Sequence, residues 1–131
     1  MSTPAFGMVE RAVKQILIAA DDRLTDETVG GDPAYEVGMP HFVWISLIPG
    51  GSATRLEGEW YVDIDVLAPT YATAMRLALD IEALLVGRAH RAPEMRLDNV
   101  YVNTGAAERP WEDENTARVG GTYVFTARRS G

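Results

Sequence analysis

The chain lacks cysteine, and it has one lysine, Lys14, and two histidines among its 131 residues. Without cysteine there are no disulfides, no thiolate nucleophiles and no cysteine-based zinc sites. No apolar run approaches the roughly 20 residues that span a bilayer, and the longest, Phe42 to Ile48, has the length of a strand. The first residues, Met1 to Phe6, lack the basic and apolar regions of a signal peptide. These absences favour a soluble chain and fit a cytoplasmic origin.

The composition is that of one ordinary globular domain, predicted to span residues 1–131. Hydrophobic residues make up 47% and charged residues 24%, which is typical of a folded chain. The length suffices to bury a core without metals or disulfides. The formal net charge is −7, so the chain repels nucleic-acid phosphates at long range. We therefore expect no specific DNA or RNA binding.

Two segments have the apolar spacing of amphipathic helices. The first begins at Thr3, the expected N-cap, and continues to about Ala20. The second begins at Thr70, another N-cap, and ends near Gly87, which suits the left-handed position after a helix. Each segment carries one apolar stripe, so each is expected to pack against a sheet.

Four segments are predicted to be strands: 42–48, about 56–67, 97–104 and about 116–128. The first two form a hairpin, and the Pro49 to Ser52 turn breaks the first strand. The pair Gly120-Gly121 in the last strand indicates a bulge or a close approach of another backbone. The sequence thus predicts an α+β fold of order α-β-β-α-β-β. It consists of a four-stranded, mostly antiparallel or mixed sheet with two helices on one face.

No motif of catalysis or metal binding is present. His41 and His90 lack metal-ligand spacing, and both are expected to have structural roles. Glu57, Glu59, Asp63 and Asp65 share one side of the second strand, which leaves open a Ca²⁺ or Mg²⁺ site or an acid/base pair. The favoured interpretation is a solvated strand face, because no loop of oxygen ligands surrounds them. We predict no catalytic residue, no metal, no cofactor and no enzymatic activity.

Two long loops, residues 21–40 and 105–115, are the candidates for contacts with other chains. Such loops are uncommon in compact domains unless they are functional or disordered. Trp111 follows Pro110 in the second loop and is either a core cap or a partner-binding anchor. The candidate interface residues are Trp111, Arg109, Arg118 and Arg128. The candidate assembly loops carry the pairs Gly30-Gly31 and Gly50-Gly51.

Three segments resemble the tail terminator proteins of long-tailed bacteriophages, also called tail-tube capping or tail completion proteins. The first is Pro40-His41-Phe42-Val43-Trp44-Ile45 followed by Pro49-Gly50-Gly51. The second runs from Val62 through Asp63-Ile64-Asp65 to Pro69-Thr70 and into the helix that follows. The third is Glu108-Arg109-Pro110-Trp111, followed by Ala117-Arg118-Val119 and Thr122 to Arg128. With the first helix, the likeness covers most of the chain in order.

The resemblance implies a structural virion protein at the head-proximal end of the tail, assembled in the bacterial host cytoplasm. Such a protein forms a ring, usually a homohexamer, that docks on the tail tube, stops its polymerisation and presents a joining surface to the head connector. Its partners are further copies of itself, the major tail-tube protein and the head-closure or connector protein, and DNA passes through without specific binding. Asp63, Asp65 and Glu59 are then candidates for a lumen or intersubunit position. Two alternatives stay open: another neck protein, for head closure or head-tail joining, and a small ligand-binding or enzymatic α+β domain.

Overall fold

The computed structural model describes residues 7–53, 57–93, 95–113 and 115–129. No helix in these ranges is long and apolar enough to cross a membrane. The described residues contain two helices and six strands: α1 (Met8–Ala20), β1 (Val29–Gly30), β2 (Phe42–Ala53), β3 (Glu57–Ala68), α2 (Tyr71–Leu85), β4 (His90–Ala92), β5 (Met95–Glu108) and β6 (Ala117–Arg129).

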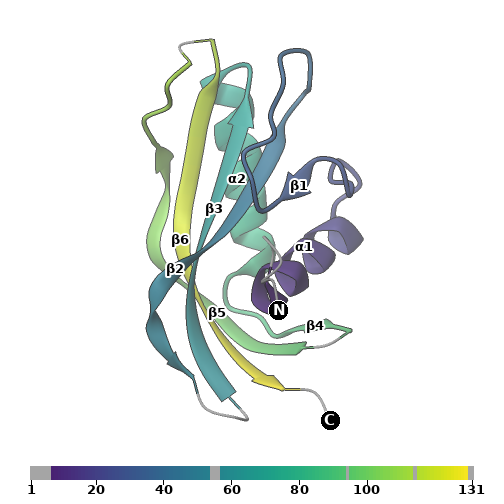
Figure 1. Ribbon diagram of the computed structural model, residues 1–131, viewed down its shortest axis with the longest axis vertical. Coiled ribbons are helices and arrows are strands. Elements are labelled where there is room, and N and C mark those ends of the chain that lie inside the picture. Colours follow the sequence, from purple (N-terminus) through teal and green to yellow (C-terminus); the bar gives the residue numbers. More distant parts are fainter. Residues whose placement is uncertain (1–6, 54–56, 94, 114, 130–131) are drawn as a thin grey trace, which may run out of the picture.

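All six strands belong to one mixed sheet of order β1-β2-β3-β6-β5-β4, strongly twisted and curled into a half-barrel (Figure 1). β1 runs parallel to β2, and the other neighbours pair antiparallel. The prediction of a four-stranded sheet is therefore wrong. The two additional strands are the edge strands β1 and β4, which are two and three residues long. Segments this short contain too few residues for an alternating apolar pattern to be recognised.

The core lies between the helices and the sheet face that they cover. Val13 and Leu17 of α1 and Leu77 and Ile81 of α2 belong to one buried cluster. The strands add alternate side chains to the same cluster: Val43 and Ile45 of β2, Val62, Ile64 and Val66 of β3, Val119, Tyr123 and Phe125 of β6. We call this the inner face. The intervening residues of β2, β3 and β6 form the outer face.

The helix ends match the prediction for α2, whereas the predicted start of the first helix cannot be compared. Thr70 caps α2, because its side chain accepts a hydrogen bond from the Thr73 backbone N–H at 3.2 Å. Gly87 follows with φ +77°, the left-handed conformation that a side chain would disfavour. Thr3 lies outside the described residues, and α1 begins at Met8 after Gly7.

β2 does not end where the sequence indicates. The Pro49 to Ser52 segment was expected to break it, but the strand continues to Ala53 with a register shift between Ile48 and Ser52. Pro49 is tolerated because β2 pairs with β1 only at Val43 and Trp44 and has an open edge beyond them. Gly50 and Gly51 consequently lie in a strand of the β2–β3 hairpin, not in a loop.

Gly120 and Gly121 allow close approach on opposite faces of β6. A Cβ at Gly120 would overlap the Asp65 carboxylate and lie 2.7 Å from the Ile64 carbonyl oxygen. A Cβ at Gly121 would lie 2.6 Å from the Tyr123 hydroxyl and 2.7 Å from the Thr104 carbonyl oxygen. The register between β3 and β6 is continuous through both positions. The pair therefore serves close packing against neighbouring strands, without a bulge between β3 and β6.

Candidate interaction site on the outer face

Arg109, Arg118, Asp63 and Asp65 form an ion network on the outer face. Asp65 is 0% exposed, although it lies on the face without helices. Arg109 Nη1 donates to Asp65 Oδ1 at 3.0 Å and lies 3.2 Å from Asp63 Oδ1. Arg118 Nη2 donates to Asp65 Oδ2 at 3.2 Å. Two carboxylates thus face two guanidinium groups, and the cluster is formally neutral.

Thr122 and a close contact of Arg118 complete the network. The Thr122 hydroxyl accepts from Arg109 Nη2 at 3.2 Å and donates to Asp63 Oδ1 at 2.5 Å. Arg118 Nε lies 3.2 Å from Asp65 Oδ1, but the geometry is not that of a hydrogen bond. The network connects β3, β6 and the segment after β5, so it holds that segment against the sheet.

Two tryptophans lie beside the network. The Trp44 and Trp111 rings meet edge to face, with centroids 6.2 Å apart and planes at 67°. The Arg118 guanidinium carbon is 5.0 Å from the Trp44 centroid and 5.7 Å from the Trp111 centroid, within cation–π distance of both. Arg118 also donates to the Pro110 carbonyl at 3.3 Å. Arg118 therefore connects the buried carboxylate to the aromatic pair.

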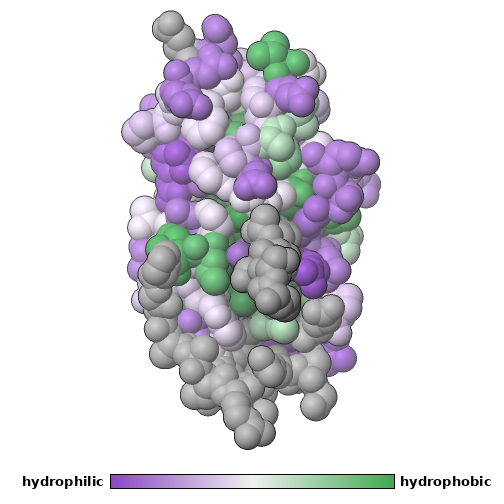
Figure 2. All heavy atoms as spheres, viewed as in Figure 1, coloured by the Kyte–Doolittle hydropathy of each residue, from purple (hydrophilic) through white to green (hydrophobic). Residues whose placement is uncertain are grey.

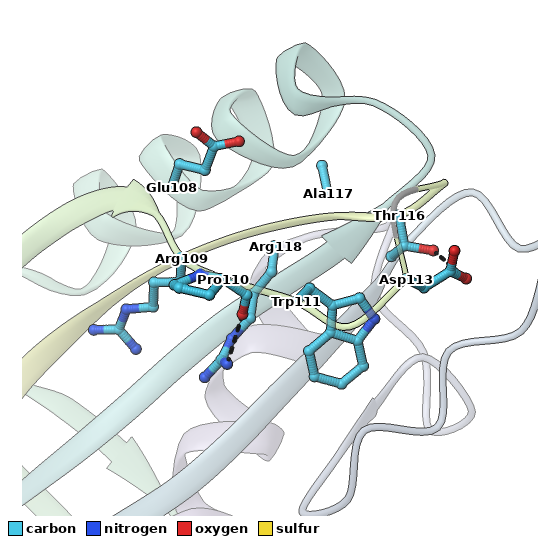
Figure 3. Close-up of a pocket in the computed structure, with 8 residues that line it drawn as sticks. All are labelled: Glu108, Arg109, Pro110, Trp111, Asp113, Thr116, Ala117 and Arg118. Atoms are coloured by element: carbon cyan, nitrogen blue, oxygen red, sulfur yellow. Dashed lines mark hydrogen bonds between the residues drawn. The ribbon is translucent and has the colours of Figure 1, made fainter.

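The same cluster fixes two loops. Trp44 Nε1 donates to the Gly31 carbonyl at 3.1 Å, which ties the loop after β1 to β2. The Arg109 backbone N–H donates to the Arg118 carbonyl at 2.8 Å and closes the base of the β5–β6 loop. In Figure 3, Arg109, Arg118 and Trp111 project to one side of β6, while Glu108 and Ala117 lie on the other. Trp111 is partly buried, so part of its ring is presented at the surface.

Two shallow pockets adjoin Trp111. One of about 420 Å³ is formed by the loop itself, between Arg109, Trp111 and Arg118 (Figure 3). The other, about 470 Å³, is open and is lined by Pro33, Trp44, Pro110, Trp111 and Glu112. Among the residues lining these two pockets there is no histidine, cysteine, lysine or serine. The described residues also contain no group of three metal-ligating side chains. The first pocket is lined mainly by charged and polar side chains, and the second provides aromatic and proline surface for noncovalent contact.

The structure brings together five of the predicted site residues: Trp111, Arg109, Arg118, Asp63 and Asp65. Glu59 lies further along β3, where its carboxylate accepts from the Tyr101 hydroxyl at 2.7 Å. That hydrogen bond raises the pKa of Tyr101. The Arg128 backbone pairs with Glu57 and Arg96, away from Trp111, and its side chain is not described. Gly30 lies in β1 and Gly31 in the bend after it.

Trp44 and Thr122 belong to the site but were not predicted. The apolar run Phe42 to Ile48 predicts a strand that is buried on both faces or nearly so, and this prediction conceals the outward position of Trp44. No alternation of polar and apolar residues marks the outer face of this strand, since Phe42, Trp44 and Ile48 are as apolar as Val43 and Ile45. The prediction of a solvated face on the Asp65 side of β3 is also incomplete. Asp65 is buried, because Arg109 and Arg118 of the same chain contact its carboxylate.

The histidines and one buried tyrosine lie away from this site. The Nε2 atoms of His41 and His90 lie 2.9 Å from the carbonyl oxygens of Arg23 and Leu85, respectively. On the inner face, the Tyr123 hydroxyl donates to Glu82 Oε1 at 2.7 Å. Burial, and then this hydrogen bond, raise the pKa of Tyr123 well above its usual value. The hydrogen bonds of His41, His90 and Tyr123 therefore indicate structural roles for these side chains.

Comparison with known proteins gives a likeness among the solved structures. No protein-family model and no curated protein sequence matches the chain. A solved structure titled "Virion of native gene transfer agent (GTA) particle" contains a chain that superposes with a TM-score of 0.65 at 22% sequence identity. The match covers 99% of this chain and 100% of that one. At this identity the likeness establishes a shared fold over the whole length.

Proposed function

We propose that this chain is a structural subunit of a phage-like virion, and specifically a tail terminator. In this role it forms a ring on the end of the tail tube, stops tube polymerisation and provides the joining surface for the head connector. Its partners are other copies of the chain, the tail-tube protein and the connector, and it needs neither metal nor cofactor.

The observation that carries the proposal is the fold match to a chain of the gene transfer agent virion. Coverage of 99% and 100% means that the match is not limited to a common α/β substructure. The sequence resemblance to tail terminators, described above, points independently to the same kind of particle. Fold alone does not determine function, so the site must agree with it.

The outer-face site is suited to binding another protein. Tryptophan and arginine are the residues that most often carry binding energy at interfaces. Here Trp111 is held by Trp44 and Arg118, so little side-chain freedom remains to be lost when a partner binds. A homomeric ring uses two different complementary patches per subunit for the contacts between its own copies. We assign the Trp111 surface to a separate contact, between the ring and one of its partner proteins.

The test is a tube-assembly assay. Tail-tube protein is allowed to polymerise with and without this chain, and tube lengths are measured by negative-stain electron microscopy. A tail terminator shortens the tubes at substoichiometric amounts, because only tube ends bind it. Unchanged lengths, together with binding to isolated connector complexes, would instead indicate a head-closure or joining protein.

A further inference from the structure

Two short stretches of sheet edge have open backbone groups. β1 pairs with β2 only at Val43 and Trp44, so no described strand covers the edge of β2 from Ile45 onward. At the other end of the sheet, β4 pairs with β5 only from Met95 to Leu97. Exposed edges of this kind are sites where another strand can add.

Each open stretch has limits set by neighbouring groups. On β5, the Gly87 N–H donates to the Val100 carbonyl at 2.8 Å, and the Ala106 N–H donates to Glu82 Oε1 at 3.2 Å. The open stretch lies between them, and we define the β5 window as Tyr101–Thr104. On β2, Pro49 has no N–H to offer. We define the β2 window as Ile45–Ile48.

The direction of the backbone groups identifies the central residue of each window. In a strand, the N–H and C=O of one residue point to the same side, and alternate residues share that side. The Val43 N–H donates to the Thr28 carbonyl at 2.8 Å, away from β3, so Leu47 also directs its backbone groups to the open edge. The Val100 carbonyl points away from β6, so Val102 does the same.

Both windows present exposed apolar side chains and carry no charge. Leu47 is 41% exposed, Val102 is 39% exposed and Tyr101 is 42% exposed. Neither window contains a charged residue, in a chain in which 24% of residues are charged. Charged side chains commonly protect edge strands from pairing with other chains. Figure 2 shows apolar side chains gathered over the middle of β2, where the β2 window lies.

We propose that the β2 window of one copy pairs antiparallel with the β5 window of a second copy. With Leu47 opposite Val102, these two apolar side chains meet on the inner face. Ile48 then lies opposite Tyr101, so apolar residues meet apolar ones, and the regular pairing ends before Asn103, because the register of β5 against β6 shifts between Val102 and Thr104. The proposal rests on the proposed ring and names one of its subunit contacts.

The topology agrees with a closed ring. Within a subunit, β2 and β5 run antiparallel, because three antiparallel pairings separate them. Rotation about a ring axis preserves strand direction relative to that axis, so the β5 of one copy meets the next copy's β2 antiparallel. The contact is head to tail, and every copy contributes one window of each kind.

The absence of cysteine makes disulfide trapping a clean test, because introduced cysteines are the only thiols. In the proposed register, Leu47 and Val102 exchange hydrogen bonds. Ile48 and Tyr101 are then a non-hydrogen-bonded pair, with Cα atoms about 4.5 Å apart. That separation is within the range of a disulfide. The double variant I48C/Y101C should therefore give a ladder of covalent multimers on a nonreducing gel after mild oxidation.

Single-cysteine variants and a double variant shifted along the strand are the controls. They test the symmetry of the contact and the register of the two paired strands. I48C alone and Y101C alone should give no covalent multimers, because a head-to-tail contact never brings identical positions together. S46C/Y101C should also fail, since Ser46 is two residues from Ile48, about 7 Å along a strand. Covalent dimers of I48C alone would indicate two-fold pairing of β2 with β2 and would overturn the proposal.

Light scattering on the same samples, alone and with tail tubes, separates the two claims. If the double variant forms oligomers in solution but no covalent multimers, the proposed edge pairing is wrong and the proposed ring still stands. A chain that stays monomeric and leaves tube ends bare contradicts the proposed function, and the edge pairing with it.

Discussion

Replacing Asp65 with alanine should destabilise the chain more than any other single change on the outer face. Its carboxylate is 0% exposed and contacts both Arg109 and Arg118. Removing one partner of a buried ion pair typically costs about 3–5 kcal/mol, because the remaining charge is left without compensation. The arginine side chains are 20% and 21% exposed, so water can partly compensate them. We therefore expect the lower end, about 3 kcal/mol of unfolding free energy.

Asp63→Ala is the matched control on the same strand. Asp63 is 23% exposed, and its described contacts are with Arg109 and the Thr122 hydroxyl. Its loss should cost about 1 kcal/mol, as for an ordinary hydrogen-bonded contact. Urea unfolding measures both values, and near-UV circular dichroism reports whether the tryptophan pair loosens in D65A. A cost for D65A below about 1 kcal/mol, or equal to that of D63A, would refute the assignment of Asp65 as the centre of the network.

Three further changes test other parts of the structure. Gly121→Ala should lower the unfolding free energy by about 2 kcal/mol, because the new methyl group meets the Thr104 carbonyl, and an unchanged urea midpoint would contradict this close approach. Above about pH 10 the unfolded chain loses the Tyr123 proton while the folded chain keeps it, so the unfolding free energy should fall by up to about 1.4 kcal/mol per pH unit. Tyr123→Phe should flatten that decline, and an identical pH profile would count against the Glu82 contact. Trp111→Ala should keep the fold but weaken tube capping about 30-fold, the loss expected for an interface hot spot, whereas Trp111→Phe should retain most of it.

Much of the secondary structure is encoded locally and could be read from the chain. The Thr70 cap and the Gly87 end of α2 depend on residues within one turn of the helix. The alternation of Trp60, Val62, Ile64 and Val66 identified β3, whose register follows from which face is buried. The parts that failed depend on partners distant in sequence. β1 exists because Val29 and Gly30 lie beside Val43 and Trp44, and no local pattern specifies that contact.

The candidate site also combines features that the local sequence indicates with features that depend on residues distant in sequence. The residue types of Trp111, Arg109 and Arg118 suggested an interface, but nothing local indicated that both arginines share Asp65. Asp65 is separated from them by 44 and 53 positions, and its burial on the outer face depends on their coverage. Trp44 was missed because a strand rich in apolar residues has no visible alternation, so its two faces cannot be distinguished from sequence alone.

The most direct test of the central claim is an image of the tube end. Tail tubes mixed with the purified chain should show one additional ring at a single end, with the rotational symmetry of the tube. Density in that ring should fit this half-barrel in class averages from electron microscopy. Tube ends that are identical with and without the chain, under conditions in which the chain is folded, would contradict the assignment as a tail terminator.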